Sequence, residues 1–157
     1  MSRILPGLYL GGIHDARDEQ QLVKNNITHI LSIYEDARPL NDVQQFCCFD
    51  ARDHSNQSLL EFIPESLEFI HAARQNKSYA VLVHCMAGIS RSATLVIAYI
   101  MIVANVDPAV AIRVVRSARR IVNPNSGFLK QLKILYDHSS CDLHRNWSAL
   151  AEAEYLI

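Results

Sequence analysis

The chain has few of the features that mark exported, membrane-spanning or nucleic-acid-binding proteins. It holds 15 Lys and Arg against 16 Asp and Glu, so its formal net charge is only −1. This balance excludes a broad cationic field for a nucleic-acid backbone or an acidic membrane. No apolar signal-peptide core opens the sequence, and the longest uncharged run, 92–106, is shorter than the roughly 20 apolar residues that span a bilayer. We therefore expect an intracellular protein, located in the cytoplasm with the nucleus also accessible, and no nucleic-acid partner.

The chain also lacks linkers, low-complexity tracts and internal repeats. Its 157 residues, half of them hydrophobic, suit one domain with a sizeable core. We predict a single domain over 1–157, with its core at about 4–140 and a C-terminal extension at 141–157. The sequence suggests no role for the extension and predicts no particular oligomeric state.

Cysteine is scarce, at four residues, and an intracellular location implies reduced thiols. Cys47 and Cys48 lie in an apolar stretch and look like small core residues. Cys141 lies between His138 and His144, a trio that could ligate a metal, but no fourth ligand is near in sequence, so no metal site is predicted. The remaining thiol, Cys85, lies in a distinctive setting.

Strand-like and helix-like segments alternate along the chain. Apolar, β-branched runs predict strands, and apolar residues at helical spacing predict helices. The expected strands cover 7–12, 28–34, 45–50 and 79–83, and the expected helices cover 15–25, 58–76, 92–106, a segment from 108 and a segment from 125. This alternation predicts an α/β fold, with a central, mostly parallel sheet of about five strands flanked by helices.

Local patterns predict details of three of these helices. Ser58 and Glu61 form a capping-box pattern, which predicts that a helix starts there. In the first helix, Leu22 and Val23 are expected to face the core. Asp107 is expected to cap the helix from 108, whose first residue is proline.

The segment around Cys85 combines a buried strand, a tight turn and a helix start. It leaves the apolar run 81–83, turns at Gly88 and enters a helix near Ser90. In parallel sheets, ligands bind beyond the carboxyl ends of the strands. Unpaired N–H groups at a helix start favour anions, and glycine tolerates the backbone angles of a tight loop. Arg91 adds a planar fork of donors that matches two phosphate oxygens. The pattern thus predicts a phosphate cradle.

The same surroundings predict a reactive thiolate at Cys85. A free thiol has a pKa near roughly 8.5, which helix N-termini and cations lower. We expect the thiolate to attack phosphorus, with the Ser92 hydroxyl donating to the sulfur when it becomes the leaving group. His84 is expected to order the loop rather than to take a proton. The C-x5-R spacing alone is a weak signal, with a buried core thiol as the alternative, and the strand, turn and helix around it make it specific.

The nine residues 84–92, HCMAGISRS, match the signature HCxxGxxRS. On this loop, and on 4–11, 28–32 and 123–128, the chain resembles the dual-specificity branch of the protein tyrosine phosphatases, and especially its small atypical members. The resemblance implies a phosphatase-type fold. It also implies two-step hydrolysis of phosphotyrosine and phosphoserine or phosphothreonine in phosphoproteins through a cysteinyl-phosphate intermediate, without metal or cofactor. Cys85 would be the nucleophile and Arg91 the phosphate ligand. The substrate-binding loop would comprise Met86, Ala87, Gly88, Ile89, Ser90 and Arg91.

The resemblance further places a general acid on a loop about thirty residues before the nucleophile. Asp53 best fits this position, with Asp50 and His54 as alternatives and an ordinary solvated loop residue as the non-functional interpretation. Asn125, which follows a proline, matches a family residue that supports the phosphate loop. A simple helix cap is its other interpretation.

Charge near the loop bears on the substrate. Residues 86–90 contain no Lys or Arg, whereas a resemblance to lipid phosphatases would imply basic residues there. A phosphoprotein is therefore favoured over an inositol lipid or an RNA 5′-triphosphate. For Arg116, Arg119 and Arg120, contact with an acidic substrate is less favoured than a solvated helix face. Ser2 stands where small relatives often carry the glycine that accepts N-myristate, so no membrane anchor is expected.

Two other functions compete with catalysis of phosphoester hydrolysis. A module that binds phosphopeptides without cleaving them is disfavoured because Cys85, Arg91 and Asp53 are all present. A redox or sulfur-transfer enzyme is disfavoured because the chain has no C-x-x-C pair, and because Cys47 and Cys48 have no evident route to the loop.

Overall fold

The structure is a computed structural model, and it describes residues 1–40 and 45–139. The strands of this part are β1 (Ser2–Leu5), β2 (Leu8–Gly11), β3 (Ile27–Ile33), β4 (Gln45–Phe49) and β5 (Ala80–His84). The helices are α1 (Ile13–Arg17), α2 (Glu19–Lys24), α3 (Ile63–Gln75), α4 (Arg91–Ala104), α5 (Pro108–Ala118) and α6 (Ser126–Ser139). The predicted extension at 141–157 lies outside the described residues.

The strands form one sheet in the order β1-β2-β5-β3-β4. β1 pairs antiparallel with β2, and the other neighbours pair in parallel. The predicted α/β fold with a mostly parallel sheet of five strands is therefore confirmed. β5 lies in the middle of the sheet and is buried along its whole length, as its continuous apolar run predicts.

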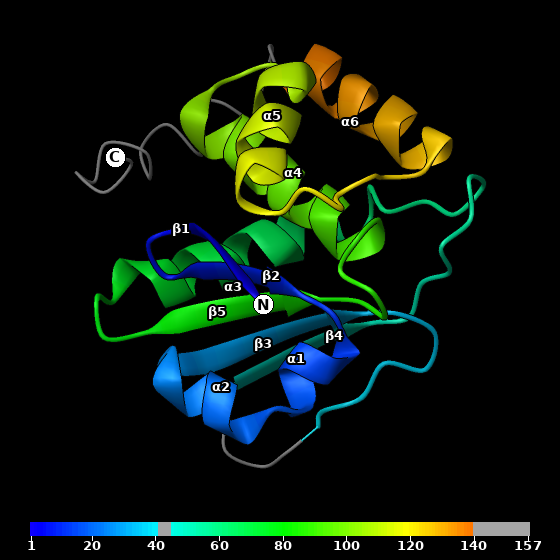
Figure 1. Ribbon diagram of the computed structural model, residues 1–157. Coiled ribbons are helices and arrows are strands. Elements are labelled where there is room, and N and C mark those ends of the chain that lie inside the picture. The colour runs from blue at the N-terminus through cyan, green and yellow to red at the C-terminus, as the bar shows by residue number, and fades with distance from the viewer. Residues whose placement is uncertain (41–44, 140–157) are drawn as a thin grey trace.

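Helices cover both faces of this sheet (Figure 1). α1 and α2 lie on one face, α3 and α4 lie on the other, and α5 and α6 pack against α4. The larger of two cores lies on the α3 and α4 face. α4 is buried from Arg91 to Val103, because its sequence after Arg91 carries no charge and is apolar on nearly every side. The helix predicted at 92–106 is thus confirmed as the central helix of the larger core.

The N-terminal part departs from the predictions in two ways. β1 was not predicted, because this short edge strand has no fully buried residue to give a strong apolar signal. The single helix expected at 15–25 is two helices, because the Asp18 carboxylate accepts a hydrogen bond from Gln21 N (3.0 Å) and so starts α2. Leu22 is buried as predicted, but the prediction for Val23 is wrong, since its side chain is 80% exposed.

The capping box predicted at Ser58 and Glu61 is also wrong, because α3 begins only at Ile63. The residues before it form a turn whose Leu59 N–H donates to Gln131 Oε1 on α6 (2.7 Å). Pro64, in the first turn of α3, has no N–H to donate to Leu60 O, so an unbroken helix cannot run from Ser58 through this position. The cap predicted for α5 is confirmed, since Asp107 Oδ1 accepts from Val110 N (3.0 Å).

The remaining predictions concern small side chains and the membrane. Cys47 is buried in the larger core as expected, whereas Cys48 is only half-buried. Within residues 1–40 and 45–139, no helix is both long and apolar enough to cross a membrane.

Candidate active site

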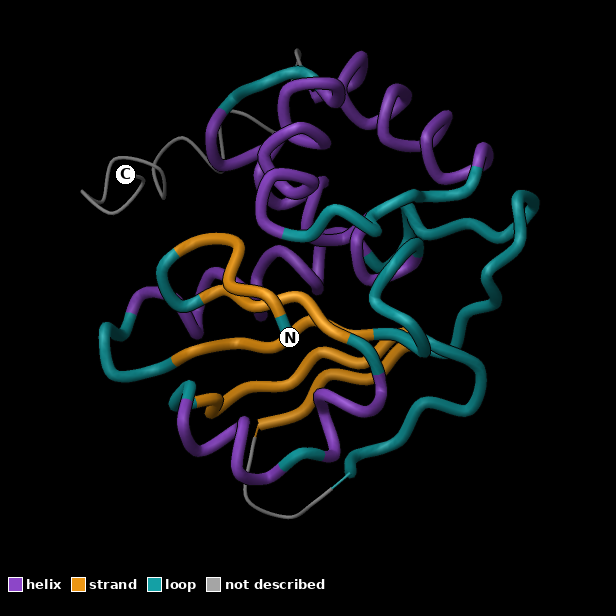
Figure 2. Tube along the Cα trace, in the orientation of Figure 1, coloured by secondary structure: helices purple, strands orange, loops and turns teal. Residues whose placement is uncertain are grey.

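The carboxyl ends of four strands meet at one edge of the sheet. β2, β3, β4 and β5 run in parallel, with Gly11 and Ser32 both in register with His84 at the end of β5. Figure 2 shows the segments that follow these strands on this same side. The loop from Cys85 and the loop from Asp50 are therefore neighbours although about 35 residues separate them in sequence.

The loop 85–90 is shaped by close packing against the end of β2. Gly88 has a positive φ of 68°, and a Cβ there would lie 2.4 Å from Gly11 O. A Cβ on Gly12 would lie 2.9 Å from Met86 O. Both positions therefore need glycine, Gly88 for its backbone angle as well as for space. The Gly11-Gly12 pair was the sequence signal for this close approach, which a simple turn assignment overlooked.

Cys85 is almost fully buried, and donors surround its sulfur. Gly88 N–H and the Ser92 hydroxyl donate to Sγ at 3.3 and 3.2 Å. Burial by itself raises the pKa of the thiol, but hydrogen bonds from the Ser92 hydroxyl and from the N–H groups of Ser92, Gly88 and Ile89 outweigh it. The net effect lowers the pKa of Cys85 below its usual value, which favours the thiolate.

His84 lies fully buried beneath the loop. Its Nδ1–H donates to Cys85 O (3.2 Å), so Nε2 accepts from the Ser32 hydroxyl (2.6 Å). Burial lowers the pKa of His84 to about 4, although the bond to Cys85 O acts in the opposite direction. The imidazole is therefore neutral near pH 7 and fixed at both nitrogens. This geometry fits the expectation that His84 orders the loop.

Arg91 extends from the start of α4 under the loop that carries Asp53. Its Nη1 donates to Ala51 O (2.9 Å), and its Nε lies 3.8 Å from Asp53 Oδ2. Nε is buried and makes no hydrogen bond to any described residue. A buried donor without an acceptor is costly, so this position favours a ligand that brings an oxygen. The edge of the guanidinium formed by Nε and Nη2 suits two oxygens of a phosphate.

The structure brings Asp53, rather than the two alternative acids, to the loop. Asp53 Oδ1 accepts from the Ser90 hydroxyl (2.8 Å) and from Asn125 Nδ2 (2.9 Å). Asp50 instead accepts from a backbone N–H of the loop after β3, and His54 accepts from the nearby Asn56 N–H. The Asp53 side chain is 37% exposed, so a substrate can reach it.

Asn125 makes contacts that fit both of its predicted interpretations. Its Oδ1 accepts from Phe128 N (3.0 Å) and so caps α6, while its Nδ2 holds Asp53. Its own N–H donates to the Ser90 hydroxyl (3.1 Å). One residue therefore links α6, the phosphate loop and the loop of Asp53.

The carbonyls of the phosphate loop point outward and meet donors from other parts of the chain. Met86 O accepts from Ile13 N, and Ile89 O accepts from Asn123 N. Ala87 O and Gly88 O accept from Arg119 Nη2 and Nε at 3.1 and 2.9 Å. The favoured prediction of a solvated helix face is thus wrong for Arg119, which follows the last turn of α5 and braces the loop. Sequence reasoning missed these donors because the segments that supply them are distant in sequence.

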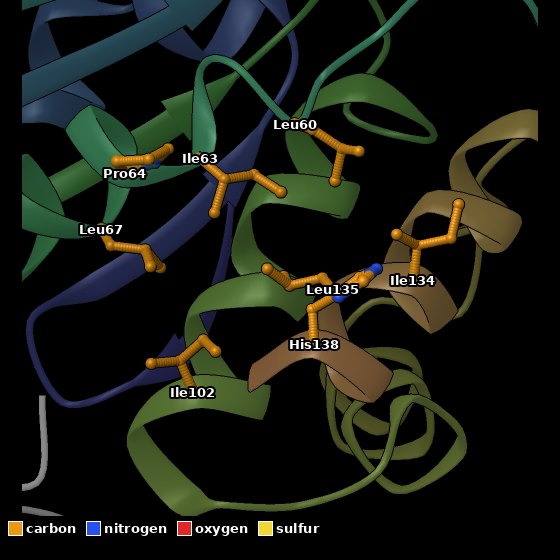
Figure 3. Close-up of a pocket in the computed structure, with 8 residues that line it drawn as sticks. All are labelled: Leu60, Ile63, Pro64, Leu67, Ile102, Ile134, Leu135 and His138. Atoms are coloured by element: carbon orange, nitrogen blue, oxygen red, sulfur yellow. The ribbon is translucent and has the colours of Figure 1, made fainter. Parts of the chain in front are cut away.

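An apolar hollow lies elsewhere on the molecule (Figure 3). It encloses about 210 Å³ between α3, α4 and α6, and all of its lining residues except His138 are apolar. Ile102, which lines it, lies near the opposite end of α4 from Arg91. Its lining does not suit a phosphate. The full lining set is Leu60, Ile63, Pro64, Leu67, Ile102, Ile134, Leu135 and His138.

Only one member of the trio His138, Cys141 and His144 lies among the described residues. His138 lies on α6, but Cys141 and His144 lie outside the described residues. Among residues 1–40 and 45–139, no cluster of three His, Cys, Asp or Glu side chains is placed to hold a metal ion.

Known proteins are similar to this chain in sequence and in fold. Residues 8–138 match the family described as "Dual specificity phosphatase, catalytic domain". The chain is 47% identical over 149 residues to dual specificity protein phosphatase 22 of Xenopus laevis, an overlap of 94% of this chain and 69% of the relative. The human protein of the same name is 46% identical over 147 residues, with 94% and 79% covered.

Solved structures agree with these sequence relatives. A crystal structure of DUSP15 superposes with a TM-score of 0.89 at 39% identity, with 95% of each chain covered. The human tyrosine phosphatase-like serine/threonine/tyrosine-interacting protein superposes with a TM-score of 0.82 at 34% identity, with 91% of this chain and 97% of that chain covered.

Proposed function

Because the chain belongs to the dual specificity phosphatase family, whose members use a cysteine-based mechanism, we propose that Cys85, Arg91 and Asp53 carry its catalysis. Cys85 is the nucleophile, Arg91 binds the phosphate, and Asp53 is the general acid. The observation that carries these roles is the pairing of a thiol surrounded by inward N–H donors with the buried Nε of Arg91, which makes no hydrogen bond to any described residue. The substrates are phosphoproteins, at phosphotyrosine and at phosphoserine or phosphothreonine.

In the first step the Cys85 thiolate attacks phosphorus. The S–P bond forms as the bond between phosphorus and the side-chain oxygen of the substrate breaks. Asp53, protonated at this stage, gives its proton to that oxygen, which leaves as a phenol or an alcohol. Arg91 and the loop N–H groups hold the three phosphoryl oxygens while negative charge redistributes. The products of this step are cysteinyl phosphate and the dephosphorylated protein.

In the second step water attacks the phosphorus of the cysteinyl phosphate. The S–P bond breaks, and the electron pair returns to Cys85 as a thiolate. The Asp53 carboxylate takes a proton from the water, which restores the acid for the next cycle. The Ser92 hydroxyl, 3.2 Å from Sγ, stabilises the departing thiolate. Inorganic phosphate is released.

Asp53→Asn should slow hydrolysis most for substrates whose leaving group must be protonated in order to depart. For aryl phosphates with poor, high-pKa leaving groups we expect kcat to fall on the order of 100-fold, because general acid catalysis contributes about that much or more. For good leaving groups, which depart without a proton, the loss should be several-fold smaller. The measurement is kcat across a series of aryl phosphates in the presence of EDTA.

Asp50→Asn is the matched control on the same loop, and it should leave the dependence on leaving-group pKa unchanged. If Asp53→Asn slows good and poor leaving groups equally, then Asp53 is not the acid. If Asp50→Asn gives the selective loss instead, the role passes to Asp50.

A further inference from the structure

The peptide groups of the phosphate loop have an inner and an outer end. Gly88 N–H and Ile89 N–H act on the Cys85 sulfur from the inner side. These N–H groups belong to the peptide units whose carbonyls are Ala87 O and Gly88 O. Those two carbonyls are the ones that the Arg119 guanidinium binds from the outer side. Each of the two peptide units is thus held between Arg119 and the sulfur.

Two other carbonyls of the loop accept hydrogen bonds from backbone N–H groups, which do not depend on the identity of any side chain. Met86 O and Ile89 O accept from the N–H groups of Ile13 and Asn123. Ala87 O and Gly88 O depend on a side chain, and the planar fork of Arg119 reaches both at hydrogen-bond distance. A cation bound to a carbonyl oxygen also polarises the peptide unit, which makes its N–H a stronger donor.

We propose that Arg119 is a positioning residue of the active site, which fixes and polarises the two peptide units whose N–H groups face the Cys85 sulfur. The inference rests on the proposed role of Cys85 as the nucleophile. Arg119 touches neither the sulfur nor the phosphate and acts through the backbone of the loop. Its third contact, from Nη1 to the Ser2 hydroxyl (3.3 Å), anchors the guanidinium to β1.

Charged groups on other elements also face this region and must stay constant in a test. Arg91 at the start of α4 lies beneath the loop, with Asp53 as its ion-pair partner. Asp15 on α1 faces Arg119 and also binds the N-terminal ammonium group. His84 below Cys85 is neutral near pH 7. A test that changes only Arg119 leaves all of these in place.

The test compares Arg119→Gln and Arg119→Lys with the unchanged chain. The rate of alkylation of Cys85 by iodoacetamide is measured against pH, with the modified Cys85 peptide quantified by mass spectrometry. Glutamine keeps donors without charge, so the alkylation midpoint should rise by about one pH unit, because the thiolate loses stabilised donors. Lysine keeps the positive charge, but its single ammonium group can bind only one of the two carbonyls closely. The alkylation midpoint of Arg119→Lys should therefore lie between that of the unchanged chain and that of Arg119→Gln.

Two further variants calibrate the measurement. Ser92→Ala removes a direct donor to the sulfur and should also raise the midpoint. Arg113→Gln removes a similar charge from an exposed position on α5 and should leave the midpoint unchanged. Circular dichroism and a thermal melt establish that each variant is folded.

The proposal is overturned if folded Arg119→Gln, or folded Arg119→Lys where the glutamine variant does not fold, alkylates with the unchanged midpoint. A lower melting temperature without a shifted midpoint would likewise assign Arg119 a structural role alone. Because alkylation is read on the Cys85 peptide and not by turnover, the result does not depend on Cys85 being the nucleophile, whose own test is the loss of activity in Cys85→Ser.

Discussion

Cys85→Ser is expected to abolish phosphatase activity, lowering kcat by at least about 10⁴-fold. The serine hydroxyl has nearly the shape of the thiol, but its pKa is so high that the donors around position 85 cannot ionise it near pH 7. The unchanged chain should hydrolyse p-nitrophenyl phosphate in the presence of EDTA and be inhibited by vanadate, an anion that resembles the phosphoryl transition state. Initial rates of p-nitrophenol release measure both effects.

Cys48→Ser is the matched control for this change. Cys48 is half-buried on β4, and its side chain hydrogen-bonds Ser32, a contact that a serine hydroxyl can also make, so its replacement should keep kcat within about twofold. Substantial turnover by a folded, homogeneous Cys85→Ser preparation would contradict the role of Cys85. A folded unchanged chain that binds phosphopeptides without any turnover would favour the binding module instead.

Arg91→Lys is expected to lower kcat/KM by roughly 10³-fold. The ammonium group retains one positive charge but lacks the fork that holds two oxygens of the transferring phosphoryl group. It also loses the geometry that joins Nη1 to Ala51 O, the bond that ties the phosphate site to the loop of Asp53. KM should rise as well, because the lost donors contact phosphate in the ground state. Steady-state kinetics with an aryl phosphate separate kcat from KM.

Arg52→Lys is the matched control for Arg91→Lys, because it makes the same substitution on the loop that carries Asp53. Arg52 forms an exposed ion pair with Glu35 (3.2 Å), and its side chain is 77% exposed. Such surface pairs contribute little, so kcat/KM should stay within about twofold. Equal losses in Arg52→Lys and Arg91→Lys would mean that the effect at position 91 does not reflect specific phosphate binding.

The sequence predicts those parts of the site whose conformation depends on residues close together in the chain. A buried strand followed by a glycine turn and a helix start places Cys85, Ser92 and the loop N–H groups without reference to the rest of the chain. The fold class followed from the alternation of apolar runs with helical spacing for the same reason. The prediction of Asp53 as the acid came from family resemblance, and the structure places its Oδ1 2.8 Å from the Ser90 hydroxyl.

The parts that sequence missed depend on contacts between distant segments. Nothing near Arg119 indicates that its guanidinium meets carbonyls 31 and 32 residues earlier in the chain. Val23 is exposed because the short helix α2 buries only Leu22. Buried backbone carbonyls need hydrogen-bond donors. In a loop whose N–H groups face inward toward an anion, the carbonyls point outward and require donors from other segments of the chain.

Isolation of the phosphorylated enzyme tests most directly whether Cys85 forms the cysteinyl-phosphate intermediate. Rapid mixing of the full chain with excess aryl phosphate, followed by acid quench and digestion, should give a peptide with one phosphate on Cys85, present at a fraction of enzyme that matches the burst of released phenol. The same experiment on Cys85→Ser should give neither burst nor phosphopeptide. Steady turnover by the unchanged chain with no phosphate on Cys85, or with phosphate on a different residue, would contradict the proposed mechanism.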